Sequence, residues 1–471
     1  MEEKFIAAVD LGSSKIALLV AKAVDDNIQM LYYKEWPSAG IRNGIVSNPT
    51  RVADVLRKAI GEVQAELQIK IFQVVVNLPK YGVKQETAEK TMERSDPDEC
   101  ITQEEVDNIK DMAKDSYPLD DPENEQLYAA IVQSFSDDES FQLGEDEIVG
   151  EMGRVLKGNF KLLIGRRSAI KGLELLFNKL GLAISKEYFS PCTIQKAVLS
   201  EEEMENGVAL IDFGGGATSV SIYRNNILRH YSAIPFGGKV VTSDIKTECS
   251  VSNSLAENIK LAYGACIPDM LATLDEKIIQ IEDLDIEDYK QIPVKYLSEI
   301  ITAREKEIID AILYEIYRNG YSMKLHSGIV ITGGGAQMTN LANMLREISG
   351  YNVRVAPPRH LLFTSEECPQ VYSPSATNAV GMALAALSDP RVRSSLERPR
   401  KATVKKPPIV VVPPVDGTSD EEEVVKEESS AVTDGSATGE PVQRRKKSFW
   451  TKFSSVIGSL YDGSAEENNN N

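Results

Sequence analysis

Val208-Ala-Leu-Ile-Asp212-Phe-Gly214-Gly215-Gly216-Ala-Thr218-Ser-Val-Ser-Ile-Tyr223 is one of two stretches of the same design; the other is Phe5-Ile-Ala-Ala-Val-Asp10-Leu-Gly12-Ser13-Ser14-Lys15-Ile-Ala-Leu-Leu-Val-Ala21. Each runs from an apolar strand through Asp-x-Gly and small residues into a second strand, which predicts a β-hairpin. Gly and Ser let backbone N–H groups approach an anion closely, so both turns suit phosphate. The two aspartates would repel phosphate, but they can hold Mg²⁺ through water.

A third glycine cluster, Gly333-Gly334-Gly335, follows the apolar strand 328–332 and precedes a helical pattern at Met338, Leu341 and Leu345. A glycine turn that opens a helix offers free N–H groups and the positive end of the helix dipole. Two phosphate hairpins and this junction predict a nucleotide clamped between two lobes. A single Asp-x-Gly hairpin is more often an ordinary tight turn, so the prediction depends on the joint pattern. No P-loop sequence occurs, and neither Asp-x-Gly turn opens a helix as a Rossmann dinucleotide site would.

Composition limits the class of protein. The 471 residues suggest about three domains, and the net charge of −19 argues against nucleic acid as a partner. Five scattered cysteines without Cys-x-x-Cys, and only three histidines, argue against a zinc site and fit a reducing cytosol. No signal peptide is evident, and no stretch approaches the roughly 20 apolar residues that span a bilayer. We expect a cytoplasmic chain whose membrane contact, if any, is peripheral.

The C-terminal tail carries a second signal. Residues 391–442 are rich in Pro and Glu and predict a disordered linker. The segment 443–463 then predicts an amphipathic helix, and 464–471 a disordered end. Its membrane-binding candidates are Arg444, Arg445, Lys446, Lys447, Phe449, Trp450, Lys452, Phe453, Val456, Ile457, Leu460 and Tyr461. The apolar members share one helical stripe and the basic members attract anionic lipid, so the helix should lie in the membrane interface. A partner-binding helix or a calmodulin-type target is the alternative.

Two middle regions are less specific. Residues 83–159 are polar and acidic, and Thr102 with Glu105 predicts a capping box at the start of a helix. By itself this composition is typical of a surface subdomain without a functional site. Gly237 and Gly238 follow a strand and precede a helix, so they can add N–H donors near a phosphate. Glu257 and Lys260 are three apart and share a helix face, which is also typical of a solvated ion pair.

Several segments together resemble the FtsA family of bacterial cell-division proteins, within the actin-like ATPase superfamily. They are Thr102-Gln-Glu-Glu105-Val106, Gly150-Glu-Met152-Gly153-Arg154, Pro235-Phe-Gly237-Gly238, Thr242-Ser-Asp244-Ile245, Ala256-Glu257-Asn-Ile-Lys260 and Ser375-Ala-Thr377-Asn-Ala-Val-Gly381. The resemblance implies an α/β, actin-like two-lobed fold: two duplicated ribonuclease-H-like lobes with inserted subdomains, a disordered linker and a C-terminal amphipathic helix. The implied divisions are 1–82 with 160–203 (first lobe), 83–159 (inserted subdomain), 204–235 with 322–390 (second lobe) and 236–321 (peripheral subdomain).

The resemblance also implies a function. An FtsA-like protein binds ATP, polymerises with itself on the inner face of the cytoplasmic membrane and tethers the FtsZ ring through the C-terminal peptide of FtsZ. It also recruits other division proteins. The FtsZ contact is implied to lie around 240–320, and the subdomain 83–159 to serve self-contact and contact with other division proteins.

Residue roles follow from the resemblance and the hairpins. Asp10 and Asp212 would hold Mg²⁺ through water. The other nucleotide-binding candidates are Gly12, Ser13, Ser14, Lys15, Gly214, Gly215, Gly216, Gly237, Gly238, Glu257, Lys260, Gly333, Gly334 and Gly335. Lys15 would neutralise the phosphates, Glu257 would face the ribose or adenine, and Lys260 would pack by its stem. The family's usual Glu-Pro reads Ser190-Pro191 here, and Glu187 and Gln195 are nearby, so no catalytic residue is assigned and slow hydrolysis is expected.

Two rival functions remain open. A metabolic kinase of the same superfamily would need a catalytic aspartate and a polar sugar pocket, and it has no use for a basic amphipathic tail. A pilus-assembly scaffold is also actin-like and membrane-linked, but it would bind a short cytoplasmic peptide of a membrane protein instead of FtsZ.

Overall fold

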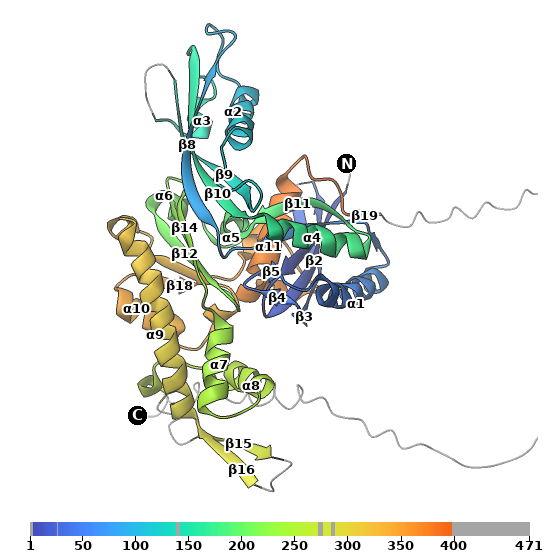
Figure 1. Ribbon diagram of the computed structural model, residues 1–471, viewed down its shortest axis with the longest axis vertical. Coiled ribbons are helices and arrows are strands. Elements are labelled where there is room, and N and C mark those ends of the chain that lie inside the picture. Colours follow the sequence, from blue (N-terminus) through green and yellow to red (C-terminus); the bar gives the residue numbers. More distant parts are fainter. Residues whose placement is uncertain (1–2, 26, 138–141, 272–276, 284–287, 398–471) are drawn as a thin grey trace, which may run out of the picture. The chain divides into compact units, whose positions relative to one another are not determined.

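The computed structural model describes residues 3–25, 27–137, 142–271, 277–283 and 288–397. The chain divides into two units, Met1–Ala402 and Thr403–Asn471. The second unit, which contains the predicted amphipathic helix 443–463, lies outside the described residues. The architecture below is that of the first unit (Figure 1).

Two five-stranded sheets share one topology. The first contains β1 (Lys4–Leu11), β2 (Lys15–Val24), β3 (Asn27–Pro37), β7 (Gln73–Leu78) and β11 (Ala183–Phe189). The second contains β12 (Val208–Phe213), β13 (Thr218–Arg224), β14 (Ile227–Ile234), β17 (Ile329–Thr332) and β18 (Val353–Val355). The orders are β3-β2-β1-β7-β11 and β14-β13-β12-β17-β18. In each sheet the first three strands along the chain are antiparallel and the last two join in parallel, so the lobes are duplicates of one ribonuclease-H-like pattern.

The central strands β1 and β12 are apolar because both faces of the sheet are covered there. In β12, Leu210 packs into the same hydrophobic cluster as the first lobe, whereas Ala209 and Ile211 pack into the cluster of the second lobe. Alternate side chains of a strand point to opposite faces, so a strand buried on both faces reads as a continuous apolar run. The first cluster therefore joins the two lobes.

Helices complete the first lobe. They are α1 (Pro49–Leu67), α4 (Arg167–Leu180), α5 (Ser190–Val198) and α11 (Thr377–Ser388). The short helix α6 (Glu201–Asn206) instead packs on β13 of the second lobe. Asn48 caps α1, and Gly181 ends α4 in the left-handed conformation with φ of 68°. Helix α11 returns from the end of the second lobe to pack on α5 and β1 (Figure 1). Gly381 permits the close approach of α11 to α5, because a Cβ there would lie 2.5 Å from the carbonyl oxygen of Thr193.

An inserted three-stranded sheet has its own core. It contains β8 (Lys84–Glu93), β9 (Glu125–Ser136) and β10 (Val155–Arg166), with α2 (Gln103–Asp115) packed on it and α3 (Glu145–Ile148) nearby. The capping box of Thr102 and Glu105 forms as the sequence predicts. Glu105 also accepts from the guanidinium of buried Arg94, whose Nε lies 2.9 Å from Oε1.

Helices and a hairpin make up the peripheral part of the second lobe, and short strands complete the list. They are α7 (Gly238–Glu248), α8 (Asn253–Tyr263), β15 (Ile278–Asp283), β16 (Asp288–Pro293) and α9 (Val294–Arg318). Helix α10 (Leu341–Ser349) packs on β18 of the second sheet. The two-residue strands are β4 (Ile41–Arg42), β5 (Ile45–Val46), β6 (Lys70–Ile71) and β19 (Leu396–Glu397). Helix α7 packs on both α8 and α9 (Figure 1).

The folded body continues beyond its predicted end. β19 pairs with β6, and the Ser395 N–H donates to the carbonyl of Phe5 (2.6 Å). Val392 and Leu396 are buried in the first cluster, so residues 391–397 belong to the body and not to the predicted linker 391–442. The Pro- and Glu-rich composition that predicts the linker begins only after these residues, whereas Val392 and Leu396 are apolar and pack into the core. The remainder of that linker lies outside the described residues.

The predicted fold class is confirmed: this is an α/β, actin-like fold of two duplicated lobes. The other predicted domain boundaries stay predictions. Among the described helices, none has the length and apolarity needed to cross a bilayer.

Candidate functional site

The two glycine turns are built alike. Asp10 lies opposite Ala17 in the first hairpin, and Asp212 lies opposite Ser219 in the second. A Cβ on Gly12 would lie 2.6 Å from the carbonyl oxygen three residues later, and a Cβ on Gly214 would lie 2.7 Å from the equivalent atom. Each turn therefore closes so tightly that only glycine fits at its first position.

The structure brings the two turns against each other. A Cβ on Gly215 would lie 2.0 Å from Ser14 Oγ, and one on Gly216 would lie 2.6 Å from Ser13 Oγ. Ser13 also accepts a hydrogen bond from the Gly44 N–H (3.0 Å). The two predicted phosphate-binding turns are thus neighbours, contributed by different lobes.

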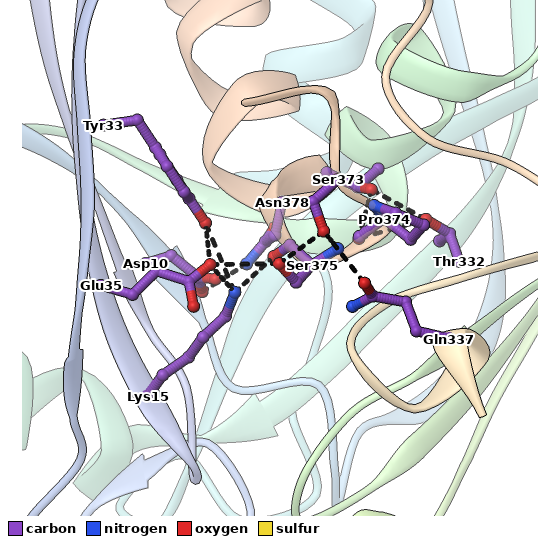
Figure 2. Close-up of polar contacts among 11 residues, drawn as sticks. Asp10, Lys15, Tyr33, Glu35, Thr332, Gln337, Ser373, Pro374, Ser375 and Asn378 are labelled. Atoms are coloured by element: carbon purple, nitrogen blue, oxygen red, sulfur yellow. Dashed lines mark hydrogen bonds and ion pairs between the residues drawn. The ribbon is translucent and has the colours of Figure 1, made fainter. Parts of the chain in front are cut away.

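Asp10 is buried at the end of β1. Asn378 of α11 donates from Nδ2 to Asp10 Oδ1 (2.6 Å), as Figure 2 shows. Burial raises the pKa of the Asp10 carboxyl, the nearby charge of Lys15 opposes this rise, and Asp212 adds a smaller upward contribution. Asp10 and Asp212 therefore act on each other electrostatically, which fits a pair that shares a divalent cation.

Lys15 lies in a polar cluster beside Asp10 (Figure 2). Its ammonium forms an ion pair with Glu35 and donates to the Ser375 carbonyl (2.9 Å) and the Tyr33 hydroxyl (3.3 Å). Burial alone would raise the pKa of Glu35, but Lys15 together with the hydrogen bonds from Tyr33 and Ser375 lowers it overall. The cation predicted to neutralise phosphate is thus already paired with a carboxylate.

Asp212 has a different partner. Its Oδ2 forms an ion pair with the ammonium of Lys80, which follows β7 of the first lobe. Both side chains are mostly buried, with 13% of Asp212 and 19% of Lys80 exposed. The charge of Asp212, in the second lobe, is therefore neutralised by a lysine of the first lobe.

Gly237 and Gly238 cover the second turn at the start of α7. The Gly238 N–H donates to the Gly214 carbonyl (3.0 Å), and the Lys239 N–H donates to the Gly215 carbonyl (2.9 Å). A Cβ on Gly237 would lie 2.3 Å from the Gly214 carbonyl oxygen. These two N–H groups are consequently used to hold the turn, and the first turn of α7 lies next to it.

Glu257 and Lys260 form the ion pair expected of their spacing. Lys260 Nζ lies 2.8 Å from Glu257 Oε2, and it also donates to the Gly238 carbonyl (3.0 Å) and Thr242 Oγ1 (2.9 Å). The Lys260 side chain is 9% exposed and that of Glu257 is 35% exposed, so the ammonium is buried and the carboxylate still meets solvent. It ties α8 to the beginning of α7 beside the second turn.

The glycine triplet differs from its prediction. Gly333 follows β17 with φ of 88°, and a Cβ there would lie 2.3 Å from Asp212 Oδ1. Gly335 begins a single 3₁₀ turn that ends at Gln337, and α10 begins only at Leu341. The prediction that the triplet opens an α-helix is wrong, because Asn340 takes a left-handed conformation (φ 63°) that separates the turn from the helix.

A cavity of about 350 Å³ lies beside the turns. Its walls include Ser13, Arg42, Gly216 and Lys239. Basic side chains next to Ser and Gly suit an anionic ligand. A larger cavity of about 1520 Å³ lies between β9 and β14 and is lined by no residue of either turn.

The residues considered for hydrolysis lie elsewhere. Ser190 is buried as the first residue of α5. Glu187 has a raised pKa because of burial and the charge of Glu174 in α4. Gln195 lines the larger cavity. No hydrolytic role is assigned to any of them.

Sequence reasoning missed two residues of the site. Lys80 follows β7, a mostly apolar strand that runs parallel to β1, so the shared carboxyl edge of the two strands was a usable signal. Asn378 stands inside the segment 375–381 that carries the family resemblance, but nothing local in the sequence connects it with Asp10.

The arrangement fits a magnesium-bound nucleotide. Tightly closed glycine turns from two lobes can surround an anion with N–H groups, and two mutually repelling carboxylates can share a divalent cation through water.

Comparison with known proteins agrees with this geometry. The family model described as cell division protein FtsA matches residues 209–381. FtsA of Neisseria meningitidis serogroup B is 27% identical over 86% of this chain and 95% of its own length. FtsA of Streptococcus pneumoniae is 28% identical over 76% of this chain and 77% of its own. Among solved structures, a PilM-PilN type IV pilus biogenesis complex matches with a TM-score of 0.56 and 16% identity, covering 81% of this chain and 98% of that one.

The pilus complex shows the fold alone at that identity, whereas the FtsA relatives match over most of their sequence. The predicted resemblance is confirmed: the chain is similar to the FtsA cell division proteins over most of its length, and these relatives support a role in cell division.

Proposed function

We propose that the chain binds ATP and Mg²⁺ between its two glycine turns and tethers the FtsZ ring to the inner face of the cytoplasmic membrane. The observation that carries nucleotide binding is the pair of equivalent turns, one from each lobe, with Asp10 and Asp212 interacting beside them. An actin-like fold implies nucleotide binding in general, and the two facing turns support the proposal that the nucleotide binds between them.

The proposed roles follow the positions described above. Asp10 and Asp212 hold Mg²⁺ through water, and the magnesium ion offsets the charge of the phosphates. The turns 12–15 and 214–216 bind the phosphates, with 237–238 supporting the second turn. Glu257 and Lys260 contact the adenosine, and 333–335 lie behind it.

The assembly roles rest on the FtsA relatives and on the sequence of the tail. In this proposal the protein polymerises with itself, binds the C-terminal peptide of FtsZ through residues 236–321 and recruits other division proteins. The basic amphipathic segment 443–463 binds anionic lipid. Its residues lie outside the described part of the chain.

Flotation with anionic liposomes and Mg-ATP tests the membrane role. The full-length protein should float, and a chain ending at Val442 should not. Neutral liposomes serve as the control, because loss of flotation there isolates the contribution of the basic residues. If neither chain floats on anionic liposomes, the membrane tether is excluded and the tail is a partner-binding helix.

Capture on the immobilised C-terminal peptide of FtsZ tests the partner. The chain ending at Val442 should still bind, because the proposed contact lies in 236–321. A scrambled peptide is the control. Equal retention on both peptides would remove FtsZ from the proposal and leave a pilus-type scaffold as the better description.

A further inference from the structure

We propose that Lys80 is a phosphate-contacting residue, supplied by the first lobe to the glycine turn of the second. The inference rests on the proposed nucleotide site and adds to it a cation that the glycine motifs do not contain. Because Lys80 pairs with Asp212 in this structure, it would exchange that partner for phosphate when Mg-nucleotide binds.

The backbone at Lys80 is held from both lobes. Lys80 lies two residues beyond β7, and Asn77 of that strand accepts a hydrogen bond from the Leu11 N–H of the first hairpin (2.7 Å). The Tyr231 hydroxyl of β14 donates to the Lys80 carbonyl, and Tyr231 is fully buried. A lysine fixed in this way by β1 and β14 is not a freely moving surface residue.

The ammonium lies over the second turn. It pairs with Asp212 Oδ2, and it is 2.9 Å from the position that a Cβ on Gly214 would occupy. Gly214 begins the turn whose N–H groups are proposed to bind phosphate, and its missing side chain leaves room for the ammonium. Lys80 therefore places a positive charge where phosphate oxygens are expected.

The partner exchange follows from charge. A divalent cation next to Asp212 neutralises that carboxylate and repels the ammonium beside it. The lysine side chain is flexible over four carbons, so its ammonium can turn to the phosphate oxygens that arrive with the cation. Lys15 has a different situation, because its partner Glu35 belongs to no proposed cation site.

Substitution of Lys80 tests the inference. Calorimetry would compare wild type with Lys80→Met for Mg-ATP and for adenosine, which carries no phosphate. Loss of a charge-assisted hydrogen bond should weaken Mg-ATP binding about tenfold to a hundredfold and leave adenosine binding unchanged. Lys84→Met is the matched control, because Lys84 pairs with Asp120 and Glu125 at the start of the inserted sheet, and it should leave both affinities unchanged.

Other outcomes would overturn it. Unchanged or tighter Mg-ATP binding by Lys80→Met would show that Lys80 only neutralises Asp212, whereas equal weakening of Mg-ATP and adenosine would indicate a general change of the cleft. If wild type itself bound no Mg-ATP, the proposed function would fall together with this inference. Lys80→Gln can still donate to Asp212 and is a second neutral variant should the methionine variant not fold. Lys80→Arg keeps the charge and should bind Mg-ATP within about threefold of wild type.

Discussion

The hairpins β1–β2 and β12–β13 share one backbone pattern, but their aspartates have different direct partners. Their aspartates sit at equivalent places in the register, and their first glycines close equally tight turns. Asp10 accepts a hydrogen bond from the neutral side chain of Asn378, whereas Asp212 forms an ion pair with Lys80 of the other lobe. Duplication of the fold has thus preserved the turn and changed what each carboxylate contacts.

The difference assigns separate tasks to the two turns. Asp10 is buried with a raised pKa, so its full charge is costly without a cation. Asp212 already holds a cation that can leave. If a nucleotide binds as proposed, the ion pair of the second hairpin is the one expected to change, and the contacts of the first hairpin are expected to stay.

The largest effect on stability is expected at Gly333, beside Asp212 of the second hairpin. Gly333 directly follows β17 with a positive φ of 88°, so Gly333→Ala would force a side chain into an unfavourable backbone conformation and place its Cβ 2.3 Å from Asp212 Oδ1. We expect a loss of about 2–5 kcal/mol in the free energy of unfolding, measured by denaturant titration. Gly334→Ala is the matched control, because Gly334 has φ of −62° and open space around its Cβ position. Equal stability of the two variants would contradict the close contact.

A second test uses a buried carboxyl in each lobe. Burial raises the pKa of Glu305 from 4.5 to about 7 against the opposing charge of Lys260, and its Oε2 has no hydrogen-bond partner among the described residues. The folded state then holds a proton that the unfolded chain releases, so this carboxyl makes stability fall as pH rises from about 4.5 to 7. Glu305→Gln should remove the fall, which amounts to at most about 3 kcal/mol by pH 8.

The measurement is the difference in unfolding free energy between Glu305→Gln and wild type at pH 5 and pH 8. The difference is needed because burial lowers the pKa of His230 to about 4, and its slope has the opposite sign. Asp10→Asn should show the same sign as Glu305→Gln, because burial also raises the pKa of the Asp10 carboxyl. Profiles that run parallel to wild type would mean that neither carboxyl titrates as its burial implies.

The sequence was informative wherever the signal was local. Strand–turn–strand patterns around Asp10 and Asp212 predicted both hairpins, and the capping box at Thr102 predicted the start of α2, because these features depend on residues a few positions apart. The Lys80–Asp212 pair joins residues 132 positions apart, and Asn378 reaches Asp10 across 368. Such pairs depend on strand order and on α11 returning to β1, which no local pattern encodes. The prediction that the glycine triplet opens an α-helix is wrong for a local reason, because the left-handed conformation of Asn340 delays the start of α10.

A smaller effect should separate the two aspartates directly. We expect Asp212→Asn to reduce the affinity for Mg-ATP about tenfold, equivalent to about 1.4 kcal/mol, because the proposed cation contact loses its charge. The loss should shrink when Mg²⁺ is replaced by a chelator. Asp10→Asn should cost less, because an amide at this buried position no longer carries a charge that burial disfavours. Calorimetry with and without Mg²⁺ measures both, and a larger loss from Asp10→Asn would reverse the roles given to the two turns.

The smallest effect is expected at Lys15, although the motif alone makes it the obvious phosphate cation. Lys15 forms an ion pair with Glu35, so Lys15→Met removes a positive charge that the Glu35 carboxylate already offsets. We expect Mg-ATP affinity to fall by about threefold or less, near the range of exposed ion pairs. Glu35→Gln releases Lys15 from its partner and should strengthen Mg-ATP binding if the ammonium can then reach the phosphates. Should Lys15→Met weaken Mg-ATP binding more than Lys80→Met, the first hairpin would supply the main phosphate-binding cation. The roles proposed for the two hairpins would then have to be exchanged.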